Sequence, residues 1–372
     1  MDTESTAGGA AAPDTPIHVR STGQAGEMWG LAIRIFLLNI VTATVYRFWG
    51  TTAVRRYIWS HTTINGEPVE YLGKGSELLI GFIIVVVFIL APLFGAFYAA
   101  QTYFPPGSAM FVVSMAAFYI VFFFLIGLAI YRALRYRLSR TAWRGIRFGL
   151  TGAATPFALK FLGLLLLNVV TLGWVTPVLD TFVMRRLSND AVFGQTPFQF
   201  DGKASRLYGP FAWVWFLGLI AYIAIAAVVG LSVASQVSGI DPEDMGGINM
   251  MAKLIPIYFL VIGFIVAAGA LIMPIYGTAR IHAWVAGLRF EGLTFTTNVT
   301  YGGLLGLTVT NALLIIFTLG IGTPIAHMRS FKFVLGNLKA HGTVDLSKIM
   351  QGRGGNPRFG EGLADAFDIG GI

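Results

Sequence analysis

The sequence predicts an all-α integral membrane protein: a multi-span helical bundle with internal repeats, three broken, re-entrant helical elements and small cytoplasmic β segments. Three observations predict this fold class. The chain of 372 residues is 55% hydrophobic and only 12% charged, whereas a soluble domain carries about 25% charged residues. The charges are bunched, so long stretches carry none. A phrase of the form Thr-Leu-Gly-x-x-Thr-Pro occurs at 171–177 and again at 318–324.

Four long apolar stretches contain no Lys, Arg, Asp or Glu: 78–100, 109–131, 207–240 and 254–279. An α-helix rises 1.5 Å per residue, so about 20 apolar residues cross a hydrocarbon core of roughly 30 Å. Backbone groups inside that core need internal hydrogen bonds, which favours helices. We therefore predict four spanning helices.

The repeated phrase belongs to an element that the chain uses three times. Each copy has an apolar run, then Thr42, Thr171 or Thr318, and then a basic residue fourteen positions later. Glycine tolerates unusual backbone angles, and proline disrupts a helix interior. The phrase is therefore predicted to break the helix, and the first copy is the most divergent because it lacks both the glycine and the proline.

The distribution of basic residues predicts the sidedness. Lys and Arg gather in 47–76, 132–156 and 181–209 and in the C-terminal part, but the link 101–108 has none. Basic loops stay in the cytoplasm, which places both chain termini there as well. The apolar segments 157–179 and 303–328 then have basic regions at both ends. We predict that each repeated element enters the membrane, breaks and returns; seven ordinary spans are the alternative.

Four glycine-bounded segments, at 66–73, 145–152, 194–202 and 287–295, read as short strands or hairpins. They are expected on the cytoplasmic face, either paired into a cap or as plain interfacial loops.

The domain organisation follows from composition. Residues 1–26 are predicted to be a disordered tail, because their acidic, proline-containing sequence lacks the pattern of a secretory signal. Residues 27–350 form a single membrane domain with repeated units 27–135, 136–280 and 281–350. The glycine-rich residues 351–372 are predicted to be a flexible tail.

Three motifs resemble the YjgN family of bacterial inner-membrane proteins, a group of unknown function. They are R-L-S-R-T-A-W-R-G-I-R-F-G-L-T-G (137–152), the N-x-x-T-L-G phrase with downstream arginines, and G-N-L-K-A-H-G-T-V-D-L (336–346). The resemblance covers about residues 27–350. It implies the bacterial inner membrane, and it implies no catalytic residues.

The breaks also predict a polar path. Non-helical backbone at membrane depth is tolerated where it is buried in protein or lines a wet cavity. The candidate residues for this path are Asn39, Asn168, Thr171, Asp180, Asn311, Thr318 and Arg34. The alternatives are structural: asparagine bonds between helices, a salt bridge of Asp180, and an Arg34 side chain that reaches the interface.

A second candidate surface is a set of arginines for lipid headgroups or a protein partner. It consists of Arg135, Arg137, Arg140, Arg144, Arg147, Arg185 and Arg186.

These features favour a transporter, channel or lipid-handling protein. The alternative is a scaffold or envelope-stress factor that binds a partner or anionic lipid through its basic face. The chain has no cysteine and none of the common nucleotide-binding or hydrolase motifs, and its histidines are scattered. We therefore expect no metal, no cofactor, no catalytic residue and no nucleic acid. The expected partners are membrane lipids and a small solute or lipid substrate, with a homo-oligomer left open.

Overall fold

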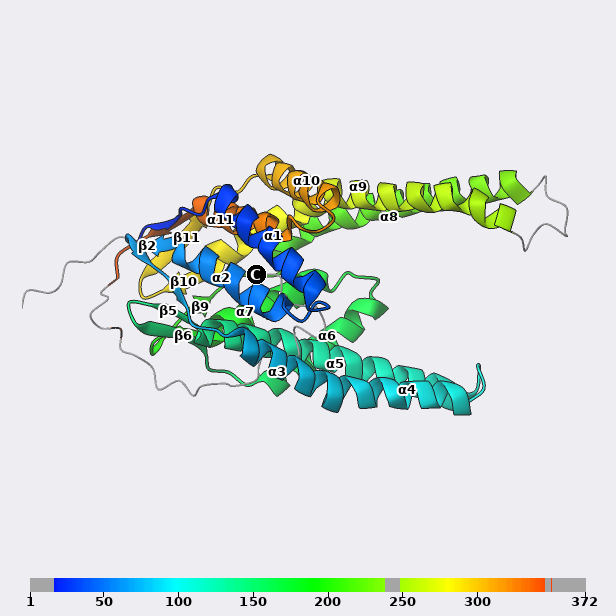
Figure 1. The fold of residues 1–372 in the computed structure, drawn as a ribbon, viewed down its shortest axis with the longest axis horizontal. Coiled ribbons are helices and arrows are strands. Elements are labelled where there is room, and N and C mark those ends of the chain that lie inside the picture. The colour runs from blue at the N-terminus through cyan, green and yellow to red at the C-terminus, as the bar shows by residue number, and fades with distance from the viewer. Residues whose placement is uncertain (1–16, 238–247, 345–348, 350–372) are drawn as a thin grey trace, which may run out of the picture.

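The computed structural model describes residues 17–237, 248–344 and 349. Five helical hairpins follow one another along these residues, and all of them project from one end of the molecule (Figure 1). Short strands gather at that end, which we call the β end. Three of the hairpins are short and two are long, in the order short, long, short, long, short.

The two long hairpins contain the predicted apolar stretches. Their helices are α3 (Gly75–Val85), a π-helical turn (Val86–Leu90), α4 (Ala91–Tyr103) and α5 (Ala109–Ser139) in the first, and α8 (Ser205–Val237) and α9 (Ile248–Gly287) in the second. The ranges Gly75–Tyr103, Ala109–Ser139, Ser205–Ser232 and Ile255–Gly287 are long and apolar enough to cross a membrane. The described residues thus contain the four long, apolar helices that the sequence predicts; that these helices span the membrane stays a prediction.

The three short hairpins, which we call the short pairs, are the predicted broken elements. They are α1 (Ala25–Val41) with α2 (Arg47–Ser60), α6 (Ala154–Val170) with α7 (Thr176–Asp190), and α10 (Tyr301–Phe317) with α11 (Thr323–Gly336). The first helix of each pair has 17 residues and the second has 14 or 15. In each pair the first helix ends at the residue before the aligned threonine.

In the part of the chain that the structure describes, the strands form three small antiparallel sheets at the β end. Their bounds are β1 (Val19–Ser21), β2 (Thr62–Ile64), β3 (Glu67–Pro68), β4 (Glu70–Tyr71), β5 (Thr141–Trp143), β6 (Ile146–Leu150), β7 (Ala191–Phe193), β8 (Thr196–Pro197), β9 (Gln199–Phe200), β10 (Leu288–Phe290), β11 (Leu293–Thr297) and β12 (Leu338–His341). The sheet orders are β1-β2-β3, β4-β5-β6-β7-β8 and β12-β11-β10-β9. Strands that follow different hairpins therefore pair with one another.

Tight turns explain the glycines of the predicted β segments. Asn65-Gly66, Arg144-Gly145 and Glu291-Gly292 have positive φ at both residues, as type I′ hairpin turns require. All four predicted segments carry strands. The tail prediction for 1–26 is wrong in part, because β1 lies inside it and pairs with β2.

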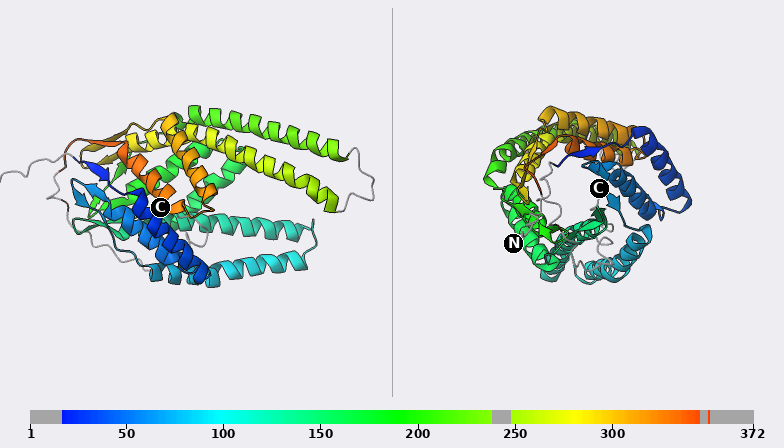
Figure 2. Two further views of the ribbon diagram at one scale, coloured as in Figure 1. Left: turned by 45° about the horizontal axis from the view of Figure 1, so that its top comes forward. Right: turned by 90° about the vertical axis from the view of Figure 1, so that its left-hand side faces the viewer.

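The five hairpins close into a ring (Figure 2). Each one packs against the next along the chain, and α11 packs against α1 to join the last hairpin to the first. Met28, Ala32, Ile58, Ile325 and Met328 form the buried core of that closing contact. The predicted units 27–135, 136–280 and 281–350 contain one short pair each, and the first two also contain most of a long hairpin. Whether these units are repeats of one another stays a prediction.

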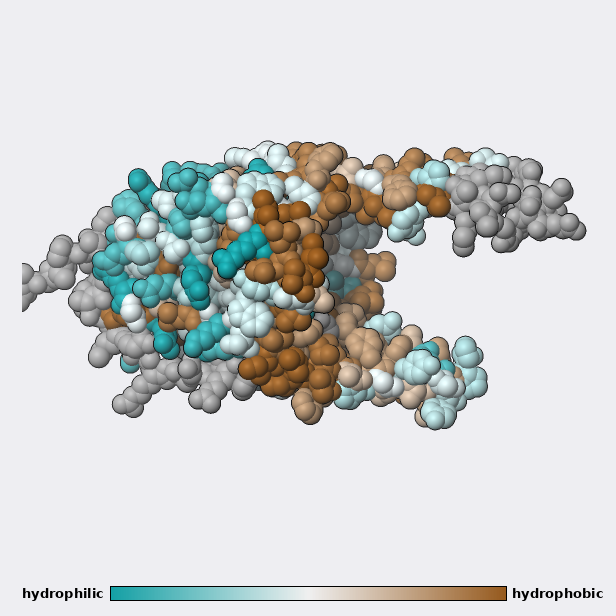
Figure 3. Space-filling model, in the orientation of Figure 1, coloured by the Kyte–Doolittle hydropathy of each residue, from teal (hydrophilic) through white to brown (hydrophobic). Residues whose placement is uncertain are grey.

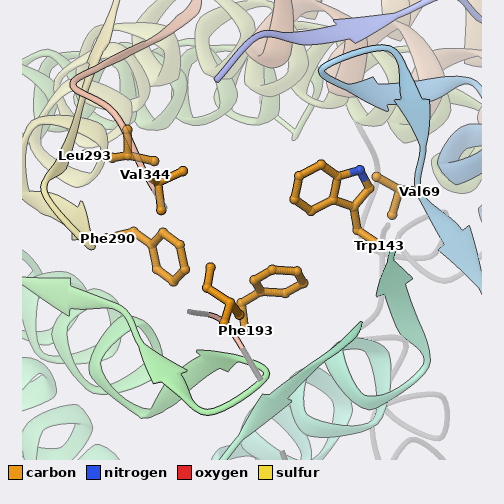
Figure 4. Close-up of a cluster of buried hydrophobic side chains, with 7 residues drawn as sticks. Val69, Trp143, Phe193, Phe290, Leu293 and Val344 are labelled. Atoms are coloured by element: carbon orange, nitrogen blue, oxygen red, sulfur yellow. The ribbon is translucent and has the colours of Figure 1, made fainter. Parts of the chain in front are cut away.

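The centre of the ring at the β end is filled by hydrophobic side chains. Figure 4 shows them converging from strands, turns and connecting segments around the ring. This central cluster consists of Val69, Trp143, Phe193, Phe290, Leu293, Val344 and Ile349. Its members come from every one of the five junctions at the β end, so the cluster ties all the hairpins together.

Candidate functional site

The break in the second short pair is a Schellman motif. The Leu172 N–H donates to the Val169 carbonyl at 3.1 Å, and the Gly173 N–H donates to the Asn168 carbonyl at 2.7 Å. Leu172 and Gly173 have φ values of 51° and 94°. These bonds satisfy carbonyls that the helix end would otherwise leave unpaired.

The other two breaks use the same geometry. Leu319 and Gly320 donate to Ile316 and Ile315 in the third pair, and Ala43 and Thr44 donate to Ile40 and Asn39 in the first. All four donor residues have positive φ. Glycine adopts this backbone readily, whereas the β-branched Thr44 at φ 70° is strained. The divergent first copy therefore keeps the conformation at a cost.

The aligned threonines cap the breaks from the side chain. Thr318 Oγ1 donates to the Leu314 carbonyl at 2.6 Å and accepts the Gly322 N–H at 2.8 Å. Thr42 makes the equivalent pair of bonds to Leu38 and Tyr46, and Thr171 donates to the Leu167 carbonyl.

The prolines have a different role from the predicted one. Pro177 and Pro324 lie in the first turn of α7 and α11, where a missing N–H costs nothing. The prediction that proline breaks the element is therefore wrong. The left-handed residues end the first helix, and proline starts the second.

Two of the predicted asparagines bond within their own pairs. The Asn168 Oδ1 accepts from the Thr176 hydroxyl at 3.1 Å. The Asn311 amide donates to the Ala326 carbonyl at 3.2 Å and to Ser330 Oγ at 3.1 Å. The Oδ1 atoms of Asn39 and Asn311 are buried and have no hydrogen-bond partner among the described residues. Whether these asparagines line a polar path stays a prediction.

The tips of the short pairs are apolar at the surface. Val41, Leu172, Phe317 and Leu319 are 75% to 90% exposed. The tip of the second short pair also contacts the second long hairpin, because the Trp215 indole N–H of α8 donates to the Leu172 carbonyl at 2.8 Å. The side chains around the breaks are thus suited to a hydrocarbon environment.

The first pair differs because two of its exposed arginines lie within the apolar first helix and next to the break. Arg34 lies within the apolar helix α1, and its side chain is exposed with no hydrogen bond or ion pair among the described residues. Arg47 is the first residue of α2, next to the break, and its guanidinium lies 4.7 Å from the Phe82 ring centre and 4.9 Å from that of Phe48. No carboxylate of the described chain pairs with either arginine.

Asp180 is held by two side chains of α9, a tyrosine and an arginine. We call such a carboxylate, bound by a tyrosine hydroxyl and a basic side chain, a carboxylate clamp. The Tyr276 hydroxyl donates to Asp180 Oδ2 at 2.8 Å, and Arg280 lies 3.6 Å from Oδ1. The structural salt bridge that was the alternative prediction for Asp180 is present. The tyrosine and the arginine are four residues apart on α9, so they lie on one face of the helix.

The same clamp occurs elsewhere and was missed in the sequence. Glu77 of α3 accepts from Tyr136 at 2.6 Å and pairs with Arg140 at 2.9 Å. Glu27 of α1 accepts from Tyr57 at 2.8 Å and lies 3.5 Å from His61. The signal that would have found these clamps is the recurring Tyr-x-x-x-Arg/His spacing. In each case the clamp joins two helices. Glu27 and Glu77 lie in the first turns of their helices at the β end, whereas Asp180 lies near the break, in the second turn of α7.

The predicted arginine surface is largely engaged within the chain. Arg140 pairs with Glu77, Arg144 with Glu67 and Arg186 with Asp190. Arg135 and Arg185 donate to the carbonyls of Gly152 and Gly202. Arg137 and Arg147 also have interaction partners. A headgroup or partner role for these arginines stays a prediction.

The carbonyl contacts follow one rule around the ring. A basic residue near the end of each returning helix reaches the carbonyl just before the next hairpin. The four contacts along the chain span 17 residues each: Arg56 to Gly73, Arg135 to Gly152, Arg185 to Gly202 and His282 to Val299. The fifth joins Lys332 to Gly23 across 309 residues.

Comparison with known proteins places the chain in a family. The model of a family described as bacterial proteins of unknown function, DUF898, matches residues 16–366. The chain belongs to the DUF898 family. This DUF898 chain is 26% identical over 128 residues to the inner membrane protein YjgN of Salmonella typhimurium, a match that covers 34% of this chain and 30% of the relative. The family predicted from the sequence is confirmed.

The aligned part spans under a third of the length of that relative. No solved structure matches this DUF898 chain. Among the described residues, no three His, Asp or Glu side chains are grouped as metal ligands would be.

Proposed function

We propose that this DUF898 protein is a lipid-handling protein of the bacterial inner membrane that moves phospholipids between the two leaflets beside its first short pair. The name of the Salmonella relative supports the location. The four long apolar helices support several crossings of the membrane. The β end, with its clustered arginines and both described chain ends, then lies in the cytoplasm.

In this arrangement the short pairs are re-entrant copies of an internal repeat. Each first helix has 17 residues and so reaches about 25 Å from the β end. The long helices have 28 to 33 residues and extend well beyond the tips. The hydrogen bonds at the breaks support a turn inside the bilayer, because non-helical backbone there must be satisfied internally.

The main support for the proposal comes from Arg34 and Arg47, the exposed arginines within the apolar helix and at the break of the first pair. Arg34 is nine residues after Ala25, or about 14 Å from the β end along the helix. Arg47 lies at the break itself. An exposed arginine at membrane depth is costly, and bilayers respond by local thinning and by drawing in water and headgroups. Two such arginines at successive depths would draw phosphate headgroups down the side of the pair.

The shape of the molecule supports the same conclusion. Figure 3 shows the two long hairpins standing apart beyond the apolar tips of the short pairs. Lipids of the far leaflet can enter the space between the hairpins and rest on side chains such as Val41 and Leu319. A headgroup drawn to Arg47 from the near leaflet then has only a thin hydrocarbon layer to cross.

The test is lipid transfer in liposomes that contain the purified protein and a headgroup-labelled fluorescent phospholipid. A membrane-impermeant reductant quenches the outer leaflet, and lipid transfer exposes the remainder. We expect transfer in protein-containing liposomes, and a loss of about fivefold or more in the double variant Arg34→Leu/Arg47→Leu. The matched control is Arg132→Leu, an exposed arginine on α5. Transfer equal to that of empty liposomes would contradict the proposal.

A polar solute path is the second candidate. It is supported by the buried, unpartnered Oδ1 atoms of Asn39 and Asn311, which could accept a hydrogen bond from a polar solute. A path that uses them predicts solute release from loaded liposomes that Asn311→Leu abolishes and Arg34→Leu leaves intact. The scaffold hypothesis has less support, because most arginines of the basic surface bond within the chain.

A further inference from the structure

A groove lies where the second long hairpin meets the third short pair. It is formed by the start of α8, the end of α9 and the first residue of α10, and its volume is about 700 Å³. That volume falls within the usual range of small-molecule sites, roughly 300–1,000 Å³. The principal lining residues are Gly209, Pro210, Trp213, Ile275, Ala279 and Tyr301.

The lining of the groove is apolar with an aromatic rim. Trp213 is 68% exposed, and Tyr301 is exposed as well. The Tyr301 hydroxyl donates to the Leu271 carbonyl at 3.0 Å, which fixes that wall. Trp and Tyr are typical of the boundary between hydrocarbon and headgroups, where the β-end portions of α8 and α9 would lie.

An exposed arginine stands at the end of the groove nearest the β end. Arg206 precedes Gly209 and Pro210 by three and four residues, so it lies on their face of α8 about one turn, or roughly 5 Å, away. Its guanidinium has no hydrogen bond or ion pair among the described residues. The groove therefore combines an apolar trough with one unneutralised positive charge at its headgroup end.

We propose that this groove binds one phospholipid, with an acyl chain along Gly209 and Trp213 and the phosphate at Arg206. The occupant must present an apolar chain and an anion within one helical turn of each other, and a phospholipid does so. A lipid with a net negative headgroup is favoured over a zwitterionic one, because Arg206 is not neutralised by the protein. The inference rests on the proposed function only in placing α8 and α9 in a membrane.

Two glycines of α8 allow a matched test of the groove. A Cβ atom at either Gly209 or Gly218 would meet no neighbour within 4 Å, so both positions accept leucine without a clash at the Cβ atom. Nine residues separate them, which places them on opposite faces of the helix. The Gly209→Leu substitution fills the groove, and Gly218→Leu adds the same side chain on the other face.

The experiment is native mass spectrometry of the protein in mild detergent, titrated with phosphatidylglycerol or phosphatidylcholine. We expect a one-to-one phosphatidylglycerol adduct that Gly209→Leu weakens about tenfold or more and Gly218→Leu leaves unchanged. Arg206→Gln should remove the preference for phosphatidylglycerol over phosphatidylcholine, whereas Arg132→Gln should keep it. Equal binding of phosphatidylglycerol by the two leucine variants would contradict the site. So would an Arg206→Gln protein that still prefers phosphatidylglycerol to phosphatidylcholine. Either result would mean that the adduct is non-specific lipid from the shell around the protein.

The lipid-transfer assay separates this inference from the proposed function. If liposomes with the wild-type protein show no transfer but the Gly209-dependent adduct forms, the groove stands and the transfer function fails. If transfer occurs and the adduct does not depend on Gly209 or Arg206, the function stands and the groove fails.

Discussion

The Lys332 ammonium donates a hydrogen bond to the Gly23 carbonyl at 3.3 Å and joins residues that are 309 positions apart in the sequence. This contact closes the ring, because Gly23 precedes α1 and Lys332 lies on α11. It is the long-range counterpart of the four contacts that span 17 residues at the other junctions. The chain thus uses one kind of bond to fix every hairpin to its neighbour.

Removal of the ring-closing bond should lower stability. In Lys332→Met the stem remains and the donor is lost, so we expect a cost of about 1 kcal/mol, the usual net value of a hydrogen bond. The measurement is the thermal unfolding midpoint in detergent. Lys339→Met is the control, because Lys339 is exposed on β12. An equal effect of the two substitutions would show that Lys332 has no special role.

The left-handed glycine of the third break should be intolerant of a side chain. Gly320 has φ 88° but open space around it, so Gly320→Ala tests backbone strain alone. We expect a loss of about 1 kcal/mol. Gly306→Ala, in the interior of α10 and also in open space, should instead be neutral or stabilising by up to about 1 kcal/mol. Chemical or thermal unfolding of the two variants measures the difference, and the same sign for both would refute the Schellman geometry as the cause.

Tyr136 of the first long hairpin should stabilise the protein through its hydrogen bond to Glu77. Tyr136 is fully buried, and its hydroxyl donates to Glu77 at 2.6 Å. Tyr136→Phe keeps the packing of the aromatic side chain but removes the hydrogen bond to the Glu77 carboxylate. We therefore expect the free energy of unfolding to fall by about 1–3 kcal/mol. Tyr258→Phe, at an exposed tyrosine of α9, should stay within about 0.5 kcal/mol. A double-mutant cycle with Glu77→Gln should show coupling, and strict additivity would contradict the clamp.

Acid should weaken the contact between Glu67 and Arg144. The hydrogen bond from Arg144 lowers the pKa of Glu67 below its usual value of 4.5. A carboxylate with a lowered pKa in the folded state stabilises the fold above that usual value, and the contribution is lost as the pH falls through the folded pKa. We expect the wild-type advantage over Glu67→Gln in thermal midpoint to be present at pH 6 and to vanish at strongly acidic pH.

Because Glu67 and Arg144 are both exposed, this advantage should be small and should shrink at high salt. A difference between the two proteins that does not change with pH would indicate another cause.

Much of the architecture could be predicted from sequence because its signals are local. The uncharged runs around Leu78 or Leu254 give the long helices directly. The glycines at 66, 145 and 292 mark turns that need positive φ. The aligned threonines mark the breaks, although proline was assigned a role that belongs to Leu172 and Gly173. Each of these features is settled within a few residues of chain.

The rest depends on contacts that no short window contains. The bond from Lys332 to Gly23 and the clamp of Asp180 by Tyr276 join distant segments. The strand β12 was not predicted, because it is placed by its pairing with β11 rather than by a pattern of its own. The candidate residues Arg34 and Asp180 were found from charge alone, but their surroundings were not.

The most direct test of the central claim is the sidedness of the second short pair. The chain contains no cysteine, so single-cysteine variants report accessibility without further changes. Arg147→Cys and Gln195→Cys place the label before α6 and after α7, and Pro106→Cys places it at the outer end of the first long hairpin; all three positions are exposed. With a membrane-impermeant maleimide on intact spheroplasts, we predict that Pro106→Cys reacts, whereas Arg147→Cys and Gln195→Cys react only after the membrane is opened. Reaction of Arg147→Cys and Gln195→Cys from opposite sides would show that the pair crosses the membrane, and would contradict the account.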